Sequence, residues 1–483
     1  MRRCVMGIDF GTSKIAAVLV DLEKKEVYVS GSKIVESNLR LDNSRHREQS
    51  ISKIKEAFFS CIESVLSREG LEVLSIGLTG QMHGILGLDR EGKAATNFVT
   101  WQDERGNLKI TNGKNLLENM EEKGGKRPIA SGYGIVTLYD WILRDQIHGI
   151  SKICTIPDYF GMLLTGNNHP VMDCTMAHSI GSYDINSGGW DFDYISDLGI
   201  DRGYFPDVAA QTTITGRLKQ GNISGFLEKG GIPVSVSIGD NQASFIGSVK
   251  DYYKSILINI GTGSQISFCI KSLEEQESIQ KIEGYDVYVR PFIENSFLVA
   301  GNALSGGVAY GTLKDFFIKT GIELFGIGNI DNIWERMENL TSIVKEEDRL
   351  CVYPLFAGKR SDPEARGRID GISLDNLTPS NLIYGTLEGI VRILRDLVDE
   401  SVIGRMNYLI GSGNGLRKNT VLRKVSSTVF RKEIMIPLFE EEAAVGAALN
   451  GAVAAGIIGS FNEAKDVIKY GPVTLKGKNF NQT

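Results

Sequence analysis

Two short glycine turns, about 250 residues apart, constrain this chain more than any other feature: Gly7 to Ser13 and Ile258 to Ser264. Each follows an apolar, strand-like run, combines Gly with Thr and Ser, and leads into a second apolar run. This pattern predicts a β-hairpin with a polar tip. Glycine at such a tip lets the backbone approach a ligand, and the adjacent N–H and hydroxyl groups can converge on phosphate oxygens.

Either turn alone is typical of an ordinary Gly/Ser/Thr hairpin, but the pair predicts two similar lobes that face one nucleotide. The spacing fits neither the P-loop nor the dinucleotide-binding fingerprint. The residues predicted to hold phosphates are Gly11, Thr12 and Ser13 in the first turn and Gly261, Thr262 and Gly263 in the second.

Strand-like and helical patterns alternate in both halves, which predicts an α/β protein. The expected strands include Ser75 to Thr79, Val234 to Ile238, Phe297 to Ala300 and Tyr408 to Ile410, and the expected helices include Ser50 to Leu66, Asn381 to Val402 and Thr420 to Phe430. No low-complexity linker marks a boundary. The repeat places the division near residue 250, which predicts lobes at 1–250 and 251–483 with a ligand cleft between them.

Charge and cysteine usage exclude several classes of function. The 483 residues carry a net charge of −6, from 53 basic and 59 acidic side chains without a long Lys/Arg block, so we expect no nucleic-acid partner. Six cysteines without CxxC spacing argue against a disulfide framework and a zinc site and fit a reducing cytoplasm. A strand-like run begins within three residues of the N-terminus, so we expect no signal peptide.

Only Ala443 to Phe461 has the length of a membrane span. Its apolar content is mostly Ala and Gly, interrupted by Asn450, which makes it a weak insertion segment. We therefore predict a close-packed interior helix, with acidic residues near its positive N-terminus, and no membrane role.

Asp240 follows an apolar strand and a glycine, at the point where a helix begins. It could cap that helix. At a strand end, between two phosphate hairpins, it is also placed to accept a proton from a hydroxyl nucleophile, and we predict that it is the general base.

Asp9 lies inside the first hairpin, where a carboxylate beside phosphate would be repelled unless a cation is present. Mg²⁺ prefers one or two carboxylates together with substrate phosphates, so Asp9, with Asp240 in an outer role, is the predicted magnesium anchor. The alternative is a turn-forming aspartate.

Two further segments concentrate polar and aromatic side chains at strand ends: Gly80 to Gly84, and Thr100 to Arg105. Gln, His, Asp and Arg with a Trp ring suit a polyol, because carbohydrate hydroxyls need paired polar partners and one apolar ring face. His83 alone is more typical of a structural hydrogen-bonding residue.

These motifs together resemble the FGGY family of carbohydrate kinases, over nearly the whole chain. Gly7 to Ser13 and Gly261 to Gly263 resemble the two phosphate loops of the family, and Gly239 to Asn241 resembles its catalytic aspartate segment. Asp362 to Gly367, followed by Ile369 to Ile372 and Leu387 to Gly389, resembles its C-terminal signature. The resemblance implies two actin-like (ribonuclease H-like) lobes, with ATP and sugar bound in the cleft between them.

The resemblance also implies roles for further residues. Gly411 to Gly415 and Asn419 resemble the adenosine-binding turn and helix, so Gly411, Gly413, Asn414 and Asn419 join the predicted ATP-binding residues. The predicted substrate-binding residues are Gln81, Met82, His83, Trp101, Asp103, Asp158, Asp240 and Asn241.

Within the family, the segments at 80–84, 99–103, 132–134 and 239–244 are similar to those of sedoheptulokinases. The implied activity is ATP- and Mg²⁺-dependent phosphorylation of a terminal ketose hydroxyl, with sedoheptulose as the expected substrate and a xylulokinase or other pentulose kinase as the alternative. The expected partner is this small molecule, and a homodimer is left open. The polar and aromatic residues of Gly80 to Gly84 and Thr100 to Arg105 are here called the sugar cluster. An actin-like chaperone or filament ATPase would not need this cluster, and a sugar sensor would not need Asp240.

Overall fold

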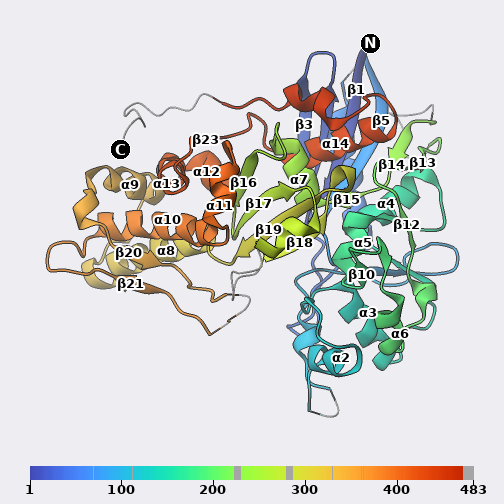
Figure 1. Cartoon of the computed structure of the whole chain (residues 1–483), viewed down its shortest axis with the longest axis horizontal. Helices are drawn as coiled ribbons and strands as arrows, with labels where there is room; N and C mark the ends of the chain where they lie inside the picture. The colour runs from blue at the N-terminus through green and yellow to red at the C-terminus, as the bar shows by residue number, and fades with distance from the viewer. Residues whose placement is uncertain are drawn as a thin grey trace. The chain divides into compact units, whose positions relative to one another are not determined.

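A computed structural model contains both predicted hairpins, each at the centre of its own β-sheet. The structure describes residues 1–68, 70–110, 113–221, 230–278, 287–328, 330–359, 362 and 364–471. Pro363, within the predicted C-terminal signature, lies outside these residues. Contacts divide the chain into two units, and each is described by itself (Figure 1). The first comprises Met1–Lys250, Arg290–Glu294 and Glu441–Ile468, and the second Asp251–Val289, Asn295–Glu440 and Lys469–Thr483.

The first unit is built on a seven-stranded sheet in the order β13-β14-β5-β1-β2-β3, with β15 also paired to β5. β1 and β2 form the first hairpin and β3 continues it antiparallel, whereas β5 lies parallel to β1. The strands are β1 Arg2–Phe10, β2 Lys14–Asp21, β3 Glu26–Ile34, β5 Leu71–Gly80, β13 Ile214–Arg217, β14 Pro233–Ser235 and β15 Ile238–Gly239.

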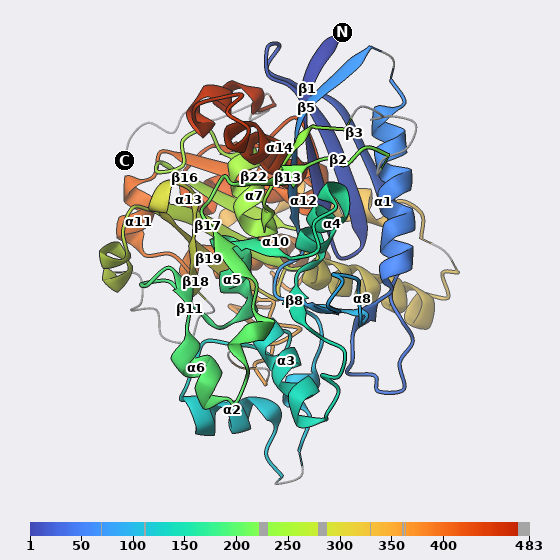
Figure 2. The ribbon, with the colours of Figure 1, turned by 90° about the vertical axis from the view of Figure 1, so that its right-hand side faces the viewer.

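Helices cover this sheet and extend into a helical region carrying short strand pairs. α1 packs along β2 and β3, as Figure 2 shows, and α14 packs against β1, β5 and α7. The helices are α1 Ile51–Leu66, α2 Leu116–Gly124, α3 Gly134–Leu143, α4 Ile156–Thr165, α5 Cys174–Ile180, α6 Phe192–Asp197, α7 Asp240–Ser248 and α14 Glu442–Ala454. The short strands are β4 Glu48–Gln49, β6 Leu86–Leu88, β7 Phe98–Val99, β8 Lys152–Cys154, β9 Val171–Asp173, β10 Tyr183–Asp184, β11 Gly189–Trp190 and β12 Asp207–Ala209.

The second unit repeats the central arrangement in a six-stranded sheet, β18-β19-β17-β16-β22-β23. β16 and β17 form the second hairpin, β19 continues it antiparallel, and β22 lies parallel to β16. The strands are β16 Ser255–Ile260, β17 Ser264–Ile270, β18 Val287–Pro291, β19 Phe297–Ala303, β22 Tyr408–Ser412 and β23 Ile434–Met435, with β20 Cys351–Tyr353 paired to β21 Arg368–Asp370. The last two residues of β18, Arg290 and Pro291, belong to the first unit by their contacts. The helices are α8 Gly307–Phe325, α9 Ile333–Leu340, α10 Pro379–Asp396, α11 Glu400–Arg405, α12 Gly413–Lys418 and α13 Thr420–Phe430.

Three predicted elements differ from the structure. The helix expected over Asn381 to Val402 is two helices, α10 and α11, because Asp399 caps the second by accepting a 2.8 Å bond from the Ser401 N–H. The strand expected over Val234 to Ile238 is split into β14 and β15. The interior helix expected over Ala443 to Phe461 ends at Ala454. None of the helices in the described ranges has the length and apolarity that crossing a membrane requires.

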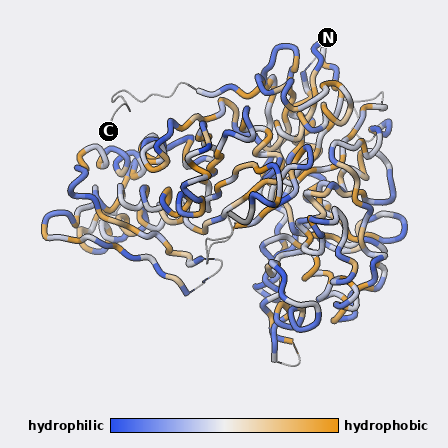
Figure 3. The backbone as a smooth tube through the Cα atoms, in the orientation of Figure 1, coloured by the Kyte–Doolittle hydropathy of each residue, from blue (hydrophilic) through white to orange (hydrophobic). Residues whose placement is uncertain are grey.

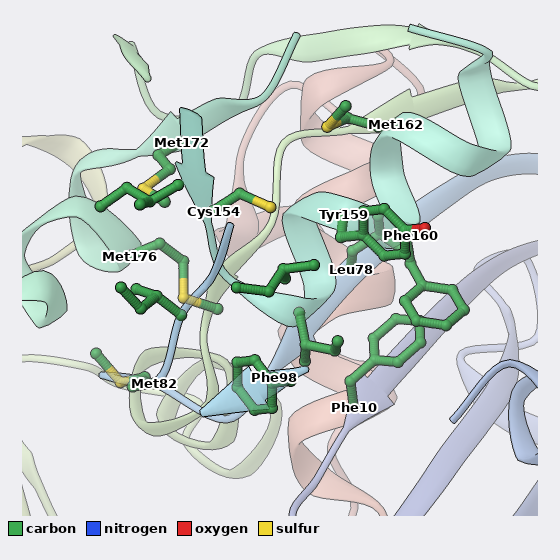
Figure 4. Packing of buried hydrophobic residues seen from close by; sticks show 14 of the residues in the cluster. Phe10, Leu78, Met82, Phe98, Cys154, Tyr159, Phe160, Met162, Met172 and Met176 are labelled. Carbon is green, nitrogen blue, oxygen red and sulfur yellow. The ribbon is translucent and has the colours of Figure 1, made fainter. Parts of the chain in front are cut away.

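Apolar residues concentrate in the central strands, as the hydropathy colouring in Figure 3 shows. Buried and exposed residues alternate little in β1 and β2. Most residues of both strands are buried, as expected for strands covered on both faces. In the first unit this core continues from the sheet into the neighbouring helices, where Figure 4 shows Phe10, Leu78, Tyr159 and Phe160 packed together.

Candidate active site

The polar turn of the first hairpin is held by packing on two sides. The ring of Phe10, the last residue of β1, lies 4.5 Å from the ring of Phe160 and 5.6 Å from that of Phe58, centroid to centroid. On another side of β1, a Cβ at Gly7 would lie 1.8 Å from the carbonyl oxygen of Ala444 in α14. Only glycine permits this approach, so the strand that carries the turn is fixed against α14.

Thr12, in this turn, is bonded directly to the predicted sugar cluster. The Trp101 indole Nε1–H donates to Thr12 Oγ1 at 2.9 Å, and Thr12 Oγ1 lies 3.3 Å from Gln81 Oε1. Gln49 Nε2 donates to the Thr12 carbonyl oxygen at 2.8 Å and Gln81 Nε2 donates to Gln49 Oε1 at 3.0 Å. The structure therefore brings together the predicted phosphate turn and two predicted sugar residues, and it adds Gln49, which the sequence analysis missed.

Asp9 and Asp240 lie within electrostatic reach of each other. Burial raises the pKa of Asp9 to about 7, with the charges of Asp240 and Glu441 acting in the same direction and Lys14 opposing them. Burial also raises the pKa of Asp240 to about 6. Asp9 Oδ1 is buried and accepts no hydrogen bond from any described residue. Two carboxylates of raised pKa, one with an orphaned oxygen, are typical of a functional site.

Asp240 is the first residue of α7, and Gly239 before it is the N-cap residue. The Asn241 backbone N–H bonds to the Asp240 carboxylate, which favours its ionised form. The junction is fixed from behind, because the Gly239 N–H donates to Thr175 Oγ1 at 2.8 Å and the Thr175 hydroxyl donates to Asp173. The predicted general base thus lies at a strand end with a defined backbone.

Met82 and His83 follow β5, whose last residues pair with β15. Met82 is buried and packs on Gly239. His83 has a left-handed backbone (φ 71°), its ring stacks on Tyr133 at 4.3 Å, and its Nδ1 lies 2.8 Å from the Ser179 carbonyl oxygen. That oxygen only accepts, so Nδ1 carries the proton. His83 therefore has a structural hydrogen bond, and a contact with sugar stays a prediction.

Asp103 is surrounded by protein donors. Its Oδ1 accepts from the Arg105 N–H and Nε at 2.9 and 2.8 Å, and its Oδ2 accepts from the Arg47 N–H at 2.8 Å and Arg105 Nη2 at 3.2 Å. A carboxylate offers about four acceptor positions, and protein groups fill them here. Arg105 is itself buried and also contacts Asp140 and Glu48. The geometry favours a scaffold role for Asp103, and its predicted sugar contact is untested.

Asp158, another predicted substrate-binding residue, is 4% exposed in the first turn of α4. Its Oδ2 accepts a 2.5 Å bond from the Thr155 hydroxyl, and its Oδ1 accepts from the Ser237 hydroxyl. Burial raises its pKa to about 7, and the nearby Asp173 adds to the shift. Its direct contact with substrate stays a prediction. Asn241, the second residue of α7, is also buried.

Arg290 is a site residue that the sequence analysis missed. The segment Arg290–Glu294 packs within the first unit, where Gln242 Nε2 donates to the Pro291 carbonyl oxygen at 3.1 Å. The Arg290 side chain is buried, and its Nη1 lies 3.2 Å from Met82 Sδ. Its charge lowers the pKa of Asp240 against the effect of burial, and with burial it lowers the pKa of His178 to about 3. No local motif marks this arginine, because only tertiary packing brings it to Asp240.

The predicted nucleotide residues of the second unit gather at the carboxyl ends of β16 and β22, which are parallel neighbours. Gly413 has φ 84°, and a Cβ there would lie 2.5 Å from Asn259 Oδ1. The hairpin turn is fixed to the start of α8, since the N–H groups of Gly307 and Val308 donate to carbonyl oxygens of Gly261 and Thr262. The backbone of this turn is therefore defined on the side of α8.

Two other predicted nucleotide-binding residues of the second unit, Asn419 and Asn414, differ in their surroundings. Asn419 caps α13 by accepting from the Leu422 N–H at 2.8 Å, and Asn414 is exposed on α12. Asn419 Oδ1 thus has a structural role, and its adenosine contact stays a prediction.

Comparison with known proteins identifies the family. The model of the FGGY family of carbohydrate kinases, N-terminal domain, matches residues 4–247, and the model of its C-terminal domain matches residues 294–455. The chain belongs to the FGGY family. It is accordingly a carbohydrate kinase, a phosphotransferase, as the sequence analysis predicted.

Curated relatives of this FGGY kinase are named for different substrates, although their sequence identity to it is similar. The chain is 24% identical to sedoheptulokinase from Mus musculus, over 93% of this chain and 97% of the relative. It is also 24% identical to glycerol kinase from Thermococcus onnurineus, over 98% and 94%. These identities do not separate one substrate from another.

Solved structures confirm the predicted fold class. Xylulose kinase from Lactobacillus acidophilus superimposes with a TM-score of 0.81 at 20% identity, covering 97% of this chain and 93% of that one. Plasmodium falciparum glycerol kinase with ADP gives a TM-score of 0.76 at 18% identity, covering 96% and 92%. The FGGY kinase therefore has the two-domain, actin-like α/β fold.

Proposed function

We propose that this kinase transfers the γ-phosphoryl group of ATP to the terminal hydroxyl of a ketose, and that the ketose is sedoheptulose, giving sedoheptulose 7-phosphate. The observation that carries the proposal is the position of Asp240. It begins α7 at a strand end, lies within electrostatic reach of Asp9, and follows Gly239, on which Met82 of the sugar cluster packs.

In the proposed reaction the sugar hydroxyl oxygen forms a bond to the γ-phosphorus, and the bond from that phosphorus to the β,γ-bridging oxygen breaks, releasing ADP. The hydroxyl proton passes to Asp240. With a pKa of about 6, this carboxylate is mostly ionised at pH 7 to 8 and basic enough to accept the proton as it is released. Positioning and charge neutralisation supply most of the acceleration in phosphoryl transfer.

The residues fit a magnesium ion. Asp9 offers a buried oxygen that accepts no hydrogen bond from the described residues, and the nearby Asp240 carboxylate suits an outer role. When bound with the nucleotide, Mg²⁺ would neutralise phosphate charge and relieve the repulsion between the two carboxylates. Magnesium binding by Asp9 and Asp240 is part of the proposal.

The nucleotide-binding residues are proposed on their positions in two hairpin turns and one strand-to-helix turn. Gly11 and Ser13, and the backbone of Thr12, would contact phosphates in the first unit. In the second unit, the proposed nucleotide contacts are Gly261, Thr262, Gly263, Gly411, Gly413, Asn414 and Asn419.

The choice of sedoheptulose rests on sequence similarity around Gln81–Gly84, Trp101–Asp103 and Gly239–Ser244. The likeness to a xylulose kinase structure supports the pentulose alternative. A site whose polar groups are matched to hydroxyls loses roughly 1–3 kcal/mol for each group that a shorter sugar leaves unpaired. Sedoheptulose should therefore exceed D-xylulose in kcat/KM by about fivefold or more.

The test is coupled ADP release measured with sedoheptulose, D-xylulose, D-ribulose and glycerol, each against a sugar-free blank. Asp240→Asn should lower kcat by about 10²–10⁴ with little change in sugar binding. A higher kcat/KM for a pentulose would overturn the sedoheptulose assignment and leave the kinase class standing. ATP turnover that does not depend on sugar would favour an actin-like ATPase instead. A homodimer and a cytoplasmic location remain predictions.

A further inference from the structure

Four side chains of the first unit form one continuous hydrogen-bonded chain: Gln49, Gln81, Thr12 and Trp101. Gln49 is fully buried at the end of β4 and Gln81 is 3% exposed after β5, whereas the Trp101 side chain reaches solvent. The distances along the chain are 2.8 Å from Gln49 Nε2 to the Thr12 carbonyl oxygen, 3.0 Å from Gln81 Nε2 to Gln49 Oε1, 3.3 Å from Thr12 Oγ1 to Gln81 Oε1 and 2.9 Å from Trp101 Nε1 to Thr12 Oγ1.

The direction of every bond in this chain is fixed by its first member. A carbonyl oxygen only accepts, so the amide nitrogen of Gln49 must face Thr12 O. The same nitrogen also donates to Asn38 Oδ1 at 3.1 Å. Gln49 then presents its oxygen to Gln81, whose amide nitrogen must face it. The remaining oxygen of Gln81 faces the Thr12 hydroxyl.

The proton of the Thr12 hydroxyl is therefore committed to Gln81. The indole N–H of Trp101 is only a donor and occupies one lone pair of Thr12 Oγ1. One lone pair is left, so Thr12 Oγ1 can accept a further hydrogen bond but has no proton to give. Phosphate oxygens of ATP are themselves acceptors, whereas a sugar hydroxyl can donate.

We propose that Gln49 is a positioning residue that fixes the polarity of the Thr12 hydroxyl, so that Thr12 Oγ1 accepts a hydrogen bond from a hydroxyl of the acceptor sugar and donates none to a phosphate. This inference rests on the proposed sugar kinase function. It assigns the hydroxyl of Thr12 to the sugar and leaves only its backbone to the nucleotide. It also means that Trp101 offers the sugar its ring face, because its N–H is already used.

The first test is a double-mutant cycle with Gln49→Met and Thr12→Val, using the sugar with the highest kcat/KM. Gln49→Met should lower kcat/KM for the sugar by about 5- to 150-fold, the range expected when a buried polar group loses its partner, and should leave the KM for ATP within about twofold. In the Thr12→Val background the same substitution should have little further effect. Gln146→Met, at an exposed position of the same unit, is the matched control.

The second test needs no substrate. The indole ¹⁵N–¹H resonance of Trp101, assigned among the four tryptophans with Trp101→Phe, should shift in Gln49→Met and stay unchanged in Gln146→Met. An unshifted Trp101 resonance overturns the inference. So does a Gln49→Met variant in which the KM for ATP rises as much as the KM for sugar. The inference also fails if Gln49→Met lowers kcat/KM by the full factor when Thr12→Val is already present. An absence of sugar phosphorylation by the wild type refutes the proposed function, and the resonance still decides whether Gln49 controls Thr12.

Discussion

Asp158→Asn should stabilise the ligand-free protein at neutral and alkaline pH. Burial holds the pKa of this carboxyl at about 7 in the folded chain, against an ordinary value of 3.8. The folded state therefore favours the neutral carboxyl, and its ionisation destabilises the fold as the pH rises through that interval. Asparagine is neutral at every pH and retains an oxygen for one of the two hydroxyl donors.

The magnitude follows from the shift. Three pKa units correspond to about 4 kcal/mol at 1.36 kcal/mol per unit. Below about pH 3 the carboxyl is protonated in both folded and unfolded chains, so the advantage of asparagine is absent there. It grows with pH and levels off above pH 7. About 3 kcal/mol of the gain should appear between pH 5 and pH 8.

The assay is urea unfolding of the ligand-free wild type and variant at intervals from pH 5 to pH 8, followed by tryptophan fluorescence. Trp101, Trp141 and Trp190 are three of the four tryptophans and lie in the first unit with Asp158. The matched control is Asp193→Asn, an exposed acid in the first turn of α6.

A stability difference between Asp158→Asn and wild type that stays constant from pH 5 to pH 8 would refute the reasoning. The same variant tests the predicted substrate role. Because protein hydroxyls contact both carboxylate oxygens, we expect its KM for sugar to stay within about twofold of wild type. A much larger rise would place Asp158 in the sugar site after all.

Three further predictions follow from the site. Arg290→Met removes a charge that favours ionised Asp240. If Asp240 is the base, we expect the acid limb of kcat/KM to lie near pH 6 in the wild type and to move up by about one pH unit in the variant. An unmoved limb would argue against Asp240 as the base. Gly413→Ala places a Cβ in a crowded left-handed position, and should raise the KM for ATP about fivefold or more with little change for sugar, whereas equal changes would indicate general damage. Asp103→Ala leaves Arg105 buried without its main partner and should lower the free energy of unfolding, measured by heat or urea, by about 3 kcal/mol or more. The ratio of kcat/KM between sugars should not change. Near-wild-type stability would contradict the scaffold role.

Local sequence determined the features that need only neighbouring residues. The turns at Gly11–Ser13 and Gly261–Gly263 were predicted because each joins two adjacent strands, so the hairpin is encoded within about 20 residues. The strand-to-helix junction at Asp240 was predicted for the same reason. The family followed from such motifs, since their order along the chain is itself informative.

The surroundings of these motifs depend on residues far apart in the sequence. Arg290 lies 50 positions from Asp240, and Gln49 contacts Thr12 and Gln81 across 37 and 32 positions. Neither residue stands in a recognisable motif. Periodicity and spacing report local structure, so they cannot show which buried charge or amide meets the site.

The packing of α14 also depends on residues far apart in the sequence. The sequence alone predicted a helix rich in small residues near the C-terminus, and tertiary structure assigned that helix, α14, to the first unit, with its neighbours from Glu441 to Ile468. The physical reason is backbone contact: Gly7, Gly77 and Gly247 lie so close to α14 that no side chain would fit. Composition predicted that α14 packs closely, and only the folded chain determined which strands it packs against.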